Sequence, residues 1–337
     1  MNAPALRLTV LTALLALCVI GATGLGSSFI GPDRVISALL GDGARMDTVI
    51  VWTLRLPRVA LAVAAGMALG LAGAILQRAL RNPMAAPSIL GITDGAALGV
   101  VTFLWLFSDE ANVLTVSIQW QPLAAIIGAL AFAALVGLLT LADTRRRDPV
   151  RVILYGIALS ALAKAAVTLM MIIGPVYRAS QALQWITGSV SAAHWIDVGV
   201  VTLGLAAAVP VLIFMRLPMR QIVLDAQTAA TTGFSVDRNR IALMVLSVLL
   251  TALAISQVGA IGFVGLIAPH AARLFHGQFA AGYLVATAMI GGILVLVADT
   301  LARTIASPLE LPAGAVTALI GAPLFLMLIL RSQRSNV

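Results

Sequence analysis

Long apolar segments dominate this sequence and follow one another along almost its whole length. A run of about 20 apolar residues is the length of helix that crosses the hydrocarbon layer of a bilayer. Backbone groups in lipid must bond to one another, and a helix satisfies them within one segment. We therefore expect an all-α, polytopic membrane protein of about ten transmembrane helices, forming a single domain over residues 1–337. The expected helices span 8–29, 57–79, 88–107, 121–142, 151–174, 195–215, 239–261, 263–276, 281–302 and 313–331.

The few charged residues of the chain support a membrane protein over a soluble one. They make up 10% of the sequence, against about 25% in a soluble domain. The net charge of +8 is carried mostly by residues at the ends of apolar segments, which favours topology and lipid contacts over nucleic acid. The single cysteine, Cys18, excludes a disulfide or a cysteine cluster within one chain. The run that begins at Leu8 is longer than a signal-peptide core, so we expect a retained first helix.

The basic residues are distributed unequally between the two expected sides of the membrane. With the N-terminus in the cytoplasm, fourteen arginines lie on the cytoplasmic side and six outside, with Lys164 within a span, which accounts for all 21. An excess of Arg and Lys marks cytoplasmic loops. Both termini are therefore expected in the cytoplasm.

The motifs of common catalytic and metal sites are missing from the sequence. No G-x-x-x-x-G-K-[ST] phosphate loop and no H-E-x-x-H motif occurs, and His194, His270 and His276 lack ligand spacing. The sequence predicts no catalytic residue, no metal site and no cofactor. A transport or scaffold role is favoured over catalysis, because membrane enzymes concentrate ionisable residues at the depth where they react.

Arg55 and Arg58 flank Pro57 at the expected start of the second helix, in the sequence RLPR. A positive charge at a helix N-terminus opposes the helix dipole, and both arginines lie on the outer side against the general bias. The pair therefore predicts a docking surface for an acidic partner outside the membrane, with anchoring to lipid head groups as the alternative. Asp299 and Arg303, spaced i and i+4, are expected to pair on one helix face.

Two further segments lie at the expected membrane surfaces. A short outer helix at about 180–190 carries Trp185, which suits either an aromatic belt or a gate element. A cytoplasmic loop at about 216–238 has Asp225 and Gly233 at positions that suit the two caps of a small helix. Such an exposed helix is either a contact for a cytoplasmic motor or an ordinary interfacial loop.

The stretch GFVGLIAPHAARLFHG (262–277) resembles a site but is interpreted as a helix end. The glycines of GAIGFVG predict a break between the seventh and eighth helices, and Pro269 removes a backbone donor from the eighth. Arg273 and His276 then fall at its C-terminal end, where cations suit the dipole. His270 is expected to be a packed, hydrogen-bonded side chain.

Lys164, the single lysine, lies thirteen residues after Arg151 and hence roughly 20 Å deep in the fifth helix. A lysine at that depth costs about 2.5 kcal/mol or more, so it requires a partner or water. One hypothesis is that it faces a translocation path and attracts an anionic chelate. The alternative is a buried lysine paired with backbone carbonyls or a neighbouring carboxylate.

Together these stretches resemble the FecCD-type, BtuC-like permeases of ATP-binding-cassette importers for iron–siderophores, haem and vitamin B12. The matching stretches run in family order from about residue 55: RLPR, GAILQRALRNP, LGITDGAALG, QWITGSV, GAIGFVGLIAPHAARL, AD with Arg303, and LPAGAVTALIGAPLF. The resemblance implies a ten-helix permease of the bacterial inner membrane that works as a dimer with an identical or homologous chain. Two cytoplasmic ATPase subunits and an external substrate-binding protein are the other implied partners, besides membrane lipid.

The resemblance also implies roles for particular residues. Arg55, Arg58 and Arg303 match the arginines that face acidic residues of the binding protein. The fifth helix and the short helix after it match elements that line the path, which adds Trp185, Gly188 and Ser189 to Lys164. The cytoplasmic loop matches the ATPase-coupling element, although its acidic residue is displaced and a leucine is replaced by Thr232. The coupling residues are Leu224, Asp225, Ala226, Gln227, Thr228, Ala229 and Gly233.

The sequence thus predicts a ferric-siderophore permease whose ATP hydrolysis takes place on separate subunits, so that this chain is not itself an enzyme. Haem or vitamin B12 is the alternative cargo within the same family. From another class, a stand-alone secondary transporter with Lys164 as a relay is the rival hypothesis. A membrane enzyme with a histidine site is the third.

Overall fold

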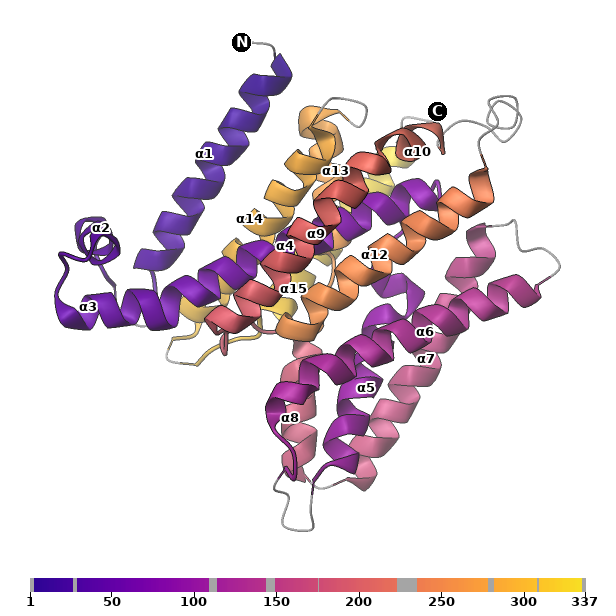
Figure 1. The fold of residues 1–337 in the computed structure, drawn as a ribbon, viewed down its shortest axis with the longest axis horizontal. Coiled ribbons are helices and arrows are strands. Elements are labelled where there is room, and N and C mark those ends of the chain that lie inside the picture. Colours follow the sequence, from indigo (N-terminus) through magenta and orange to yellow (C-terminus); the bar gives the residue numbers. More distant parts are fainter. Residues whose placement is uncertain are drawn as a thin grey trace. The chain divides into compact units, whose positions relative to one another are not determined.

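The computed structural model describes residues 3–26, 29–108, 114–143, 149–174, 176–222, 235–277, 282–307 and 309–334, and most of them are helical (Figure 1). The longer helices are α1 (Ala3–Gly24), α4 (Leu56–Ala79), α5 (Ile92–Leu106), α6 (Gln121–Ala142), α7 (Pro149–Ile173), α9 (Trp195–Phe214), α12 (Val236–Val258), α13 (Val264–His276), α14 (Tyr283–Ile305) and α15 (Ala313–Arg334). The shorter ones are α2 (Pro32–Leu40), α3 (Arg45–Val49), α8 (Val176–Thr187) and α10 (Arg216–Gln221).

Each of the ten expected segments overlaps one of the longer helices, which confirms the all-α class. Among the described residues, seven helical segments are long and apolar enough to cross a membrane. The helices α5 and α15 contribute shorter apolar stretches, Ile92–Leu106 and Ala313–Met327, and α13 has 13 residues. The count of ten spans therefore stays a prediction.

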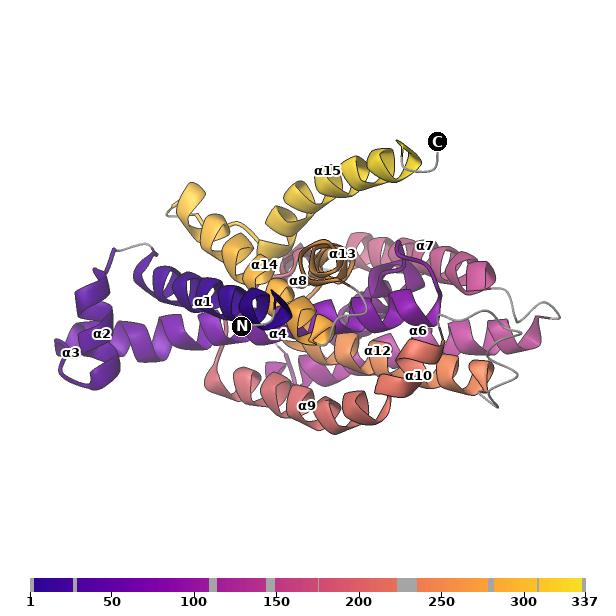
Figure 2. The same ribbon diagram turned by 90° about the horizontal axis from the view of Figure 1, so that it is seen from above.

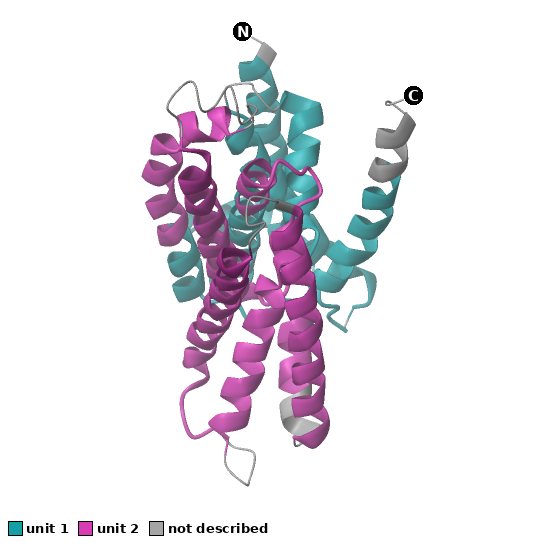
Figure 3. Ribbon diagram, turned by 90° about the vertical axis from the view of Figure 1, so that its right-hand side faces the viewer, with its two compact units in different colours: residues 1–71, 187–202, 261–337 teal, residues 72–186, 203–260 magenta. Residues whose placement is uncertain are grey.

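The chain divides into two compact units (Figure 3). The first consists of residues 1–71, 187–202 and 261–337, and the second of residues 72–186 and 203–260. In the first unit, α14 contacts α1, α13 and α15 (Figure 2). In the second unit, α5 contacts α6, α7 and α12.

Glycines set how closely the helices approach within each unit. A Cβ on Gly66 of α4 would lie 2.3 Å from the backbone oxygen of Gly291 on α14. A Cβ on Gly99 of α5 would lie 2.4 Å from the backbone oxygen of Ala124 on α6. Membrane helices approach this closely through small residues, which lets their backbones make van der Waals contact. Gly66 therefore lies at a close contact between α4 and α14.

The start of the second long helix differs from the sequence prediction. Instead of beginning at residue 57, the helical segment begins at Arg45 and continues for 35 residues to Ala79. A π-helical stretch, Ile50–Arg55, precedes Pro57. Such a widened turn lets the helix continue past a proline, which has no backbone N–H to donate. Arg55 and Arg58 therefore lie inside a helical segment, and the argument that they oppose a helix dipole was wrong.

The break between α12 and α13 lies where the glycines predict it. α12 ends at Val258 and α13 begins at Val264. Gly259 adopts φ 69°, ψ −161°, a backbone region that is essentially restricted to glycine. Phe263 also has a positive φ, of 64°, and its side chain would meet a Cβ on Gly321 at 2.6 Å. Pro269 lies inside α13, and its carbonyl accepts a hydrogen bond from the Tyr283 hydroxyl at 3.2 Å.

Candidate functional site

A buried cluster of charges in the first unit contains all three arginines that were predicted to dock a partner. Arg55, Arg58 and Arg303 are only 6%, 8% and 6% exposed. Arg55 and Arg58 lie at the junction between the π-helical stretch and α4, and Arg303 lies near the end of α14. Arg303 lies within electrostatic range of the other two arginines and of the carboxylates of Asp299 and Glu310. These five residues are called the arginine cluster below.

Arg58 binds both carboxylates of the arginine cluster. Its Nε lies 3.1 Å from both oxygens of Asp299, and its Nη2 lies 2.9 Å from Oδ1 of the same residue. Its Nη1 donates to both oxygens of Glu310 at 3.0 Å. Forked contacts of this kind are the strongest that a guanidinium makes with carboxylates. Asp299 is buried, whereas half of the Glu310 side chain is exposed.

Arg55 and Arg303 cap the C-terminal end of α1. Nη1 of Arg55 donates to the carbonyls of Thr23 and Gly24 at 2.8 Å, and Nη2 of Arg303 donates to the carbonyl of Ala22 at 2.5 Å. The last carbonyls of a helix have no intrahelical donor and carry a partial negative charge. The two guanidinium groups therefore stabilise the end of α1.

The expected pair between Asp299 and Arg303 is present but is not the main contact of either residue. Nε of Arg303 lies 3.7 Å from Oδ2 of Asp299, beyond hydrogen-bonding distance. Arg58 holds the same carboxylate at shorter distances. The cluster as a whole has three positive and two negative charges, and its most accessible carboxylate is that of Glu310.

A second polar group lies in the second unit, around Lys164 of α7. Nζ of Lys164 is 3.7 Å from Oδ2 of Asp94, in the first turn of α5, and the Ser160 hydroxyl donates to the same oxygen. The neighbouring carboxylate that the sequence left open is therefore Asp94. However, the Lys164 side chain is 69% exposed, so the burial assumed in that alternative was wrong.

The residues expected at a gate make hydrogen bonds on both sides of Thr187. The carbonyl of Trp185 accepts a hydrogen bond from the amide of Ala260 at 3.2 Å. Gly188 has φ 69°, and its carbonyl accepts from the amide of Gly314 at 3.0 Å. The Ser189 hydroxyl donates to that of Ser191 at 3.0 Å and accepts from the Ser191 amide at 3.1 Å.

The comparisons with known proteins agree with this architecture. The family model of the FecCD transport family matches residues 14–331. The chain belongs to the FecCD transport family. It is 44% identical to YfhA of Bacillus subtilis, assigned as a siderophore transport system permease, over 97% of this chain and 94% of that protein. It is 39% identical to the cobalamin import system permease BtuC of Halobacterium salinarum, over 83% of this chain and 73% of that protein.

A solved structure supports the FecCD fold as well. A transporter assigned to the metal-chelate ABC type, in an inward-facing conformation, matches with a TM-score of 0.84 and 28% identity. The match covers 96% of this chain and 98% of the solved one. The agreement extends over nearly all of both chains, so it concerns the whole fold rather than one motif.

Two carboxylates of this FecCD chain were missing from the predicted sites. Glu310 binds Arg58 across 252 residues of sequence, and Asp94 lies 70 residues before Lys164. Neither separation leaves a local pattern, although an acidic residue in so apolar a chain is a signal in itself.

Other predicted positions of the FecCD chain are only partly described. The coupling residues Leu224, Asp225, Ala226, Gln227, Thr228, Ala229 and Gly233 all lie outside the described residues. His270 is half-buried, and His276 is buried at the end of α13. Across the described parts of the chain, no three His, Cys, Asp or Glu residues gather where they could hold a metal ion.

Proposed function

We propose that this chain is the permease subunit of an ABC importer that moves a ferric siderophore across the bacterial inner membrane. The observation that carries this proposal is the similarity to the siderophore permease relative over 97% of the chain. The metal-chelate class of the solved relative points in the same direction. ATP hydrolysis belongs to separate subunits, and the absence of a phosphate-loop sequence fits that division of labour.

The assembly proposed for transport contains more chains than this one. Two permease chains, identical or homologous, enclose a central path, two ATPase subunits bind on the cytoplasmic side, and an external binding protein delivers the chelate. Each permease chain would cross the membrane ten times as one functional domain, with both termini in the cytoplasm. The arginine distribution supports that orientation. The loop at 216–238 is the proposed ATPase contact.

Lys164, in the second unit, is proposed as a path residue. Trp185, Gly188 and Ser189 are proposed as further path or gate residues, as the family resemblance implies. A lysine side chain that is 69% exposed on a membrane-spanning helix is costly against hydrocarbon. Water in a path, or a second permease chain, would cover it at lower cost. Asp94 partly balances its charge at 3.7 Å, and the remaining positive field would attract a negatively charged chelate.

The binding protein is proposed to dock over the arginine cluster. Arg55, Arg58 and Arg303 are buried. They would therefore act through the electrostatic field and the shape that they give this surface. Among the five residues of the cluster, Glu310 is the one with an extensively exposed side chain. A carboxylate of the binding protein would compete with Glu310 for Arg58.

Two rival functions make different predictions. Haem or vitamin B12 is the alternative cargo of the same machinery. The similarity to the cobalamin permease is the observation in favour of this alternative. A stand-alone secondary transporter would use Lys164 as a relay and need no ATPase.

Affinity purification of the tagged full-length chain tests the proposal. We expect an ATPase subunit to co-purify, together with a second permease chain where the partner is not identical. In vesicles that hold the complex and its binding protein, a ferric siderophore should stimulate ATP hydrolysis. Stimulation by haem or cobalamin alone would transfer the proposal to that cargo, and purification without any ATPase would contradict it.

A further inference from the structure

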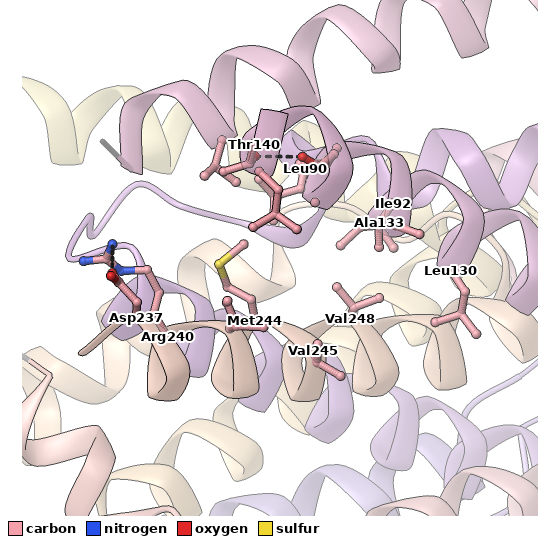
Figure 4. Close-up of a pocket in the computed structure, with 16 residues that line it drawn as sticks. Leu90, Ile92, Leu130, Ala133, Thr140, Asp237, Arg240, Met244, Val245 and Val248 are labelled. Atoms are coloured by element: carbon pink, nitrogen blue, oxygen red, sulfur yellow. Dashed lines mark hydrogen bonds and ion pairs between the residues drawn. The ribbon is translucent and has the colours of Figure 1, made fainter. Parts of the chain in front are cut away.

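A groove of about 580 Å³ lies within the second unit, between α6 and α12 (Figure 4). Leu130 and Ala133 line it from α6, and Met244 and Val248 line it from α12. Its volume is in the range of about 300–1,000 Å³ that is typical of small-ligand sites. Ile241 and Val245, which also line it, are each about half exposed. The groove is therefore open at its side to whatever surrounds α12.

The groove is polar at one end and apolar along the rest of its length. Asp237 and Arg240 lie at the start of α12, and Thr140 lies near the end of α6. Val248 lies eight residues after Arg240, which places it roughly 12 Å farther along the helix. Both helices belong to segments apolar enough to cross a membrane. The groove thus runs from the end of a spanning helix toward the membrane interior, with its charges at the end.

Arg240 is a partly buried cation with an incomplete set of partners. Its side chain is 14% exposed, and its Nε has no hydrogen-bond partner among the residues that the structure describes. Its ion pair is with Asp237, at 3.7 Å, and that carboxylate is largely exposed. Arg81 adds a further positive charge within electrostatic range. A partly buried guanidinium in this state has unused capacity to donate hydrogen bonds to an anion.

We propose that this groove is a binding site for one anionic phospholipid. Its phosphodiester accepts hydrogen bonds from Arg240, and one acyl chain lies between α6 and α12. This occupant matches all three observations: an anion for the partly buried guanidinium, an acyl chain for the apolar length, and access from the bilayer. Basic pockets between transmembrane helices bind anionic head groups for the same reason.

The test uses the full-length protein, purified in detergent and stripped of lipid, with native mass spectrometry as the readout. Phosphatidylglycerol and phosphatidylethanolamine are titrated separately. We expect the wild-type protein to retain phosphatidylglycerol with roughly fivefold higher affinity, the contribution of one basic residue. Arg240→Gln should abolish that preference. Arg238→Gln, which removes an exposed charge two residues away, should keep it.

Filling the groove provides an independent variant. A side chain at Gly137, which lines the groove, meets nothing within 4 Å of its Cβ. Gly137→Phe should therefore prevent the binding of both lipids. Gly21→Phe adds the same bulk at an equally open position on α1 and should bind them as wild type does. Val245→Trp serves as the filling variant if Gly137→Phe fails to fold.

Three results would overturn the proposal. The first is equal retention of the two lipids by the wild-type protein. The second is an equal loss in Arg240→Gln and Arg238→Gln, which would indicate a general surface charge. The third is evidence that no acyl chain contributes to binding, from either wild-type binding by a folded filling variant or full competition by inorganic phosphate.

Discussion

At the scale of single residues, replacing Arg58 tests whether this arginine stabilises the fold independently of any docked partner. Replacing it with Met leaves the carboxylate of Asp299, which is 1% exposed, without its closest guanidinium. Breaking one side of a buried ion pair costs about 3–5 kcal/mol. We expect Arg58→Met to lower the midpoint of thermal unfolding in detergent clearly, whether or not a partner is present. An unchanged midpoint would contradict the burial of this pair.

Glu310 gives the complementary prediction, because half of its side chain is exposed and it occupies one edge of Arg58. Glu310→Gln should leave the fold intact and remove the charge that competes for Arg58. If an acidic binding protein docks here, its affinity should rise roughly fivefold, equal to about 1 kcal/mol. Surface plasmon resonance measures this directly. Asp33→Asn removes an exposed carboxylate elsewhere in the first unit, and should change the affinity less. An unchanged affinity in Glu310→Gln would count against docking over the cluster.

Lys164 tests the proposed path. If its ammonium attracts the chelate, Lys164→Met should raise the KM for an anionic ferric siderophore roughly fivefold, corresponding to about 1 kcal/mol. The maximal rate should change less, because the lysine is proposed to attract the chelate and not to carry out a chemical step. Lys164→Arg keeps the charge and should stay near wild type. Normal uptake by Lys164→Met, measured in whole cells, would remove this residue from the path.

At the scale of helices, the contact between α4 and α14 depends on two glycines that face each other. A Cβ on Gly66 would lie 2.3 Å from the carbonyl oxygen of Gly291 and 2.9 Å from Cα of Gly292. Both neighbours are backbone atoms of a packed helix, so the helices must separate. We expect Gly66→Ala to cost about 1–3 kcal/mol and to lower the yield of folded protein. Gly199→Ala on α9, where nothing lies within 4 Å, is the matched control and should behave as wild type in size-exclusion chromatography.

The elements and contacts that the sequence could predict were those with a local cause. Apolar run length located the long helices, and the glycines located the break at Gly259. The spacing of Asp299 and Arg303 correctly indicated that they are neighbours. In contrast, Pro57 was taken as a helix start because proline is common at the first position of a helix, whereas here the helical segment already begins at Arg45. The pairing of Arg58 with Asp299 joins residues 241 positions apart, and only the packing of α4 against α14 brings them together.

At the scale of the whole molecule, the energy source distinguishes an importer subunit from an independent transporter. The proposed function predicts that vesicles containing this chain alone take up no ferric siderophore under a proton gradient. Uptake should appear only when the ATPase subunits, the second permease chain and the binding protein are reconstituted together with ATP. A complex whose ATPase subunit carries a hydrolysis-blocking substitution is the control, and it should not accumulate the chelate. Uptake by the isolated chain, driven by protons and abolished in Lys164→Met, would instead establish the secondary transporter, because the lysine would then be acting as its relay.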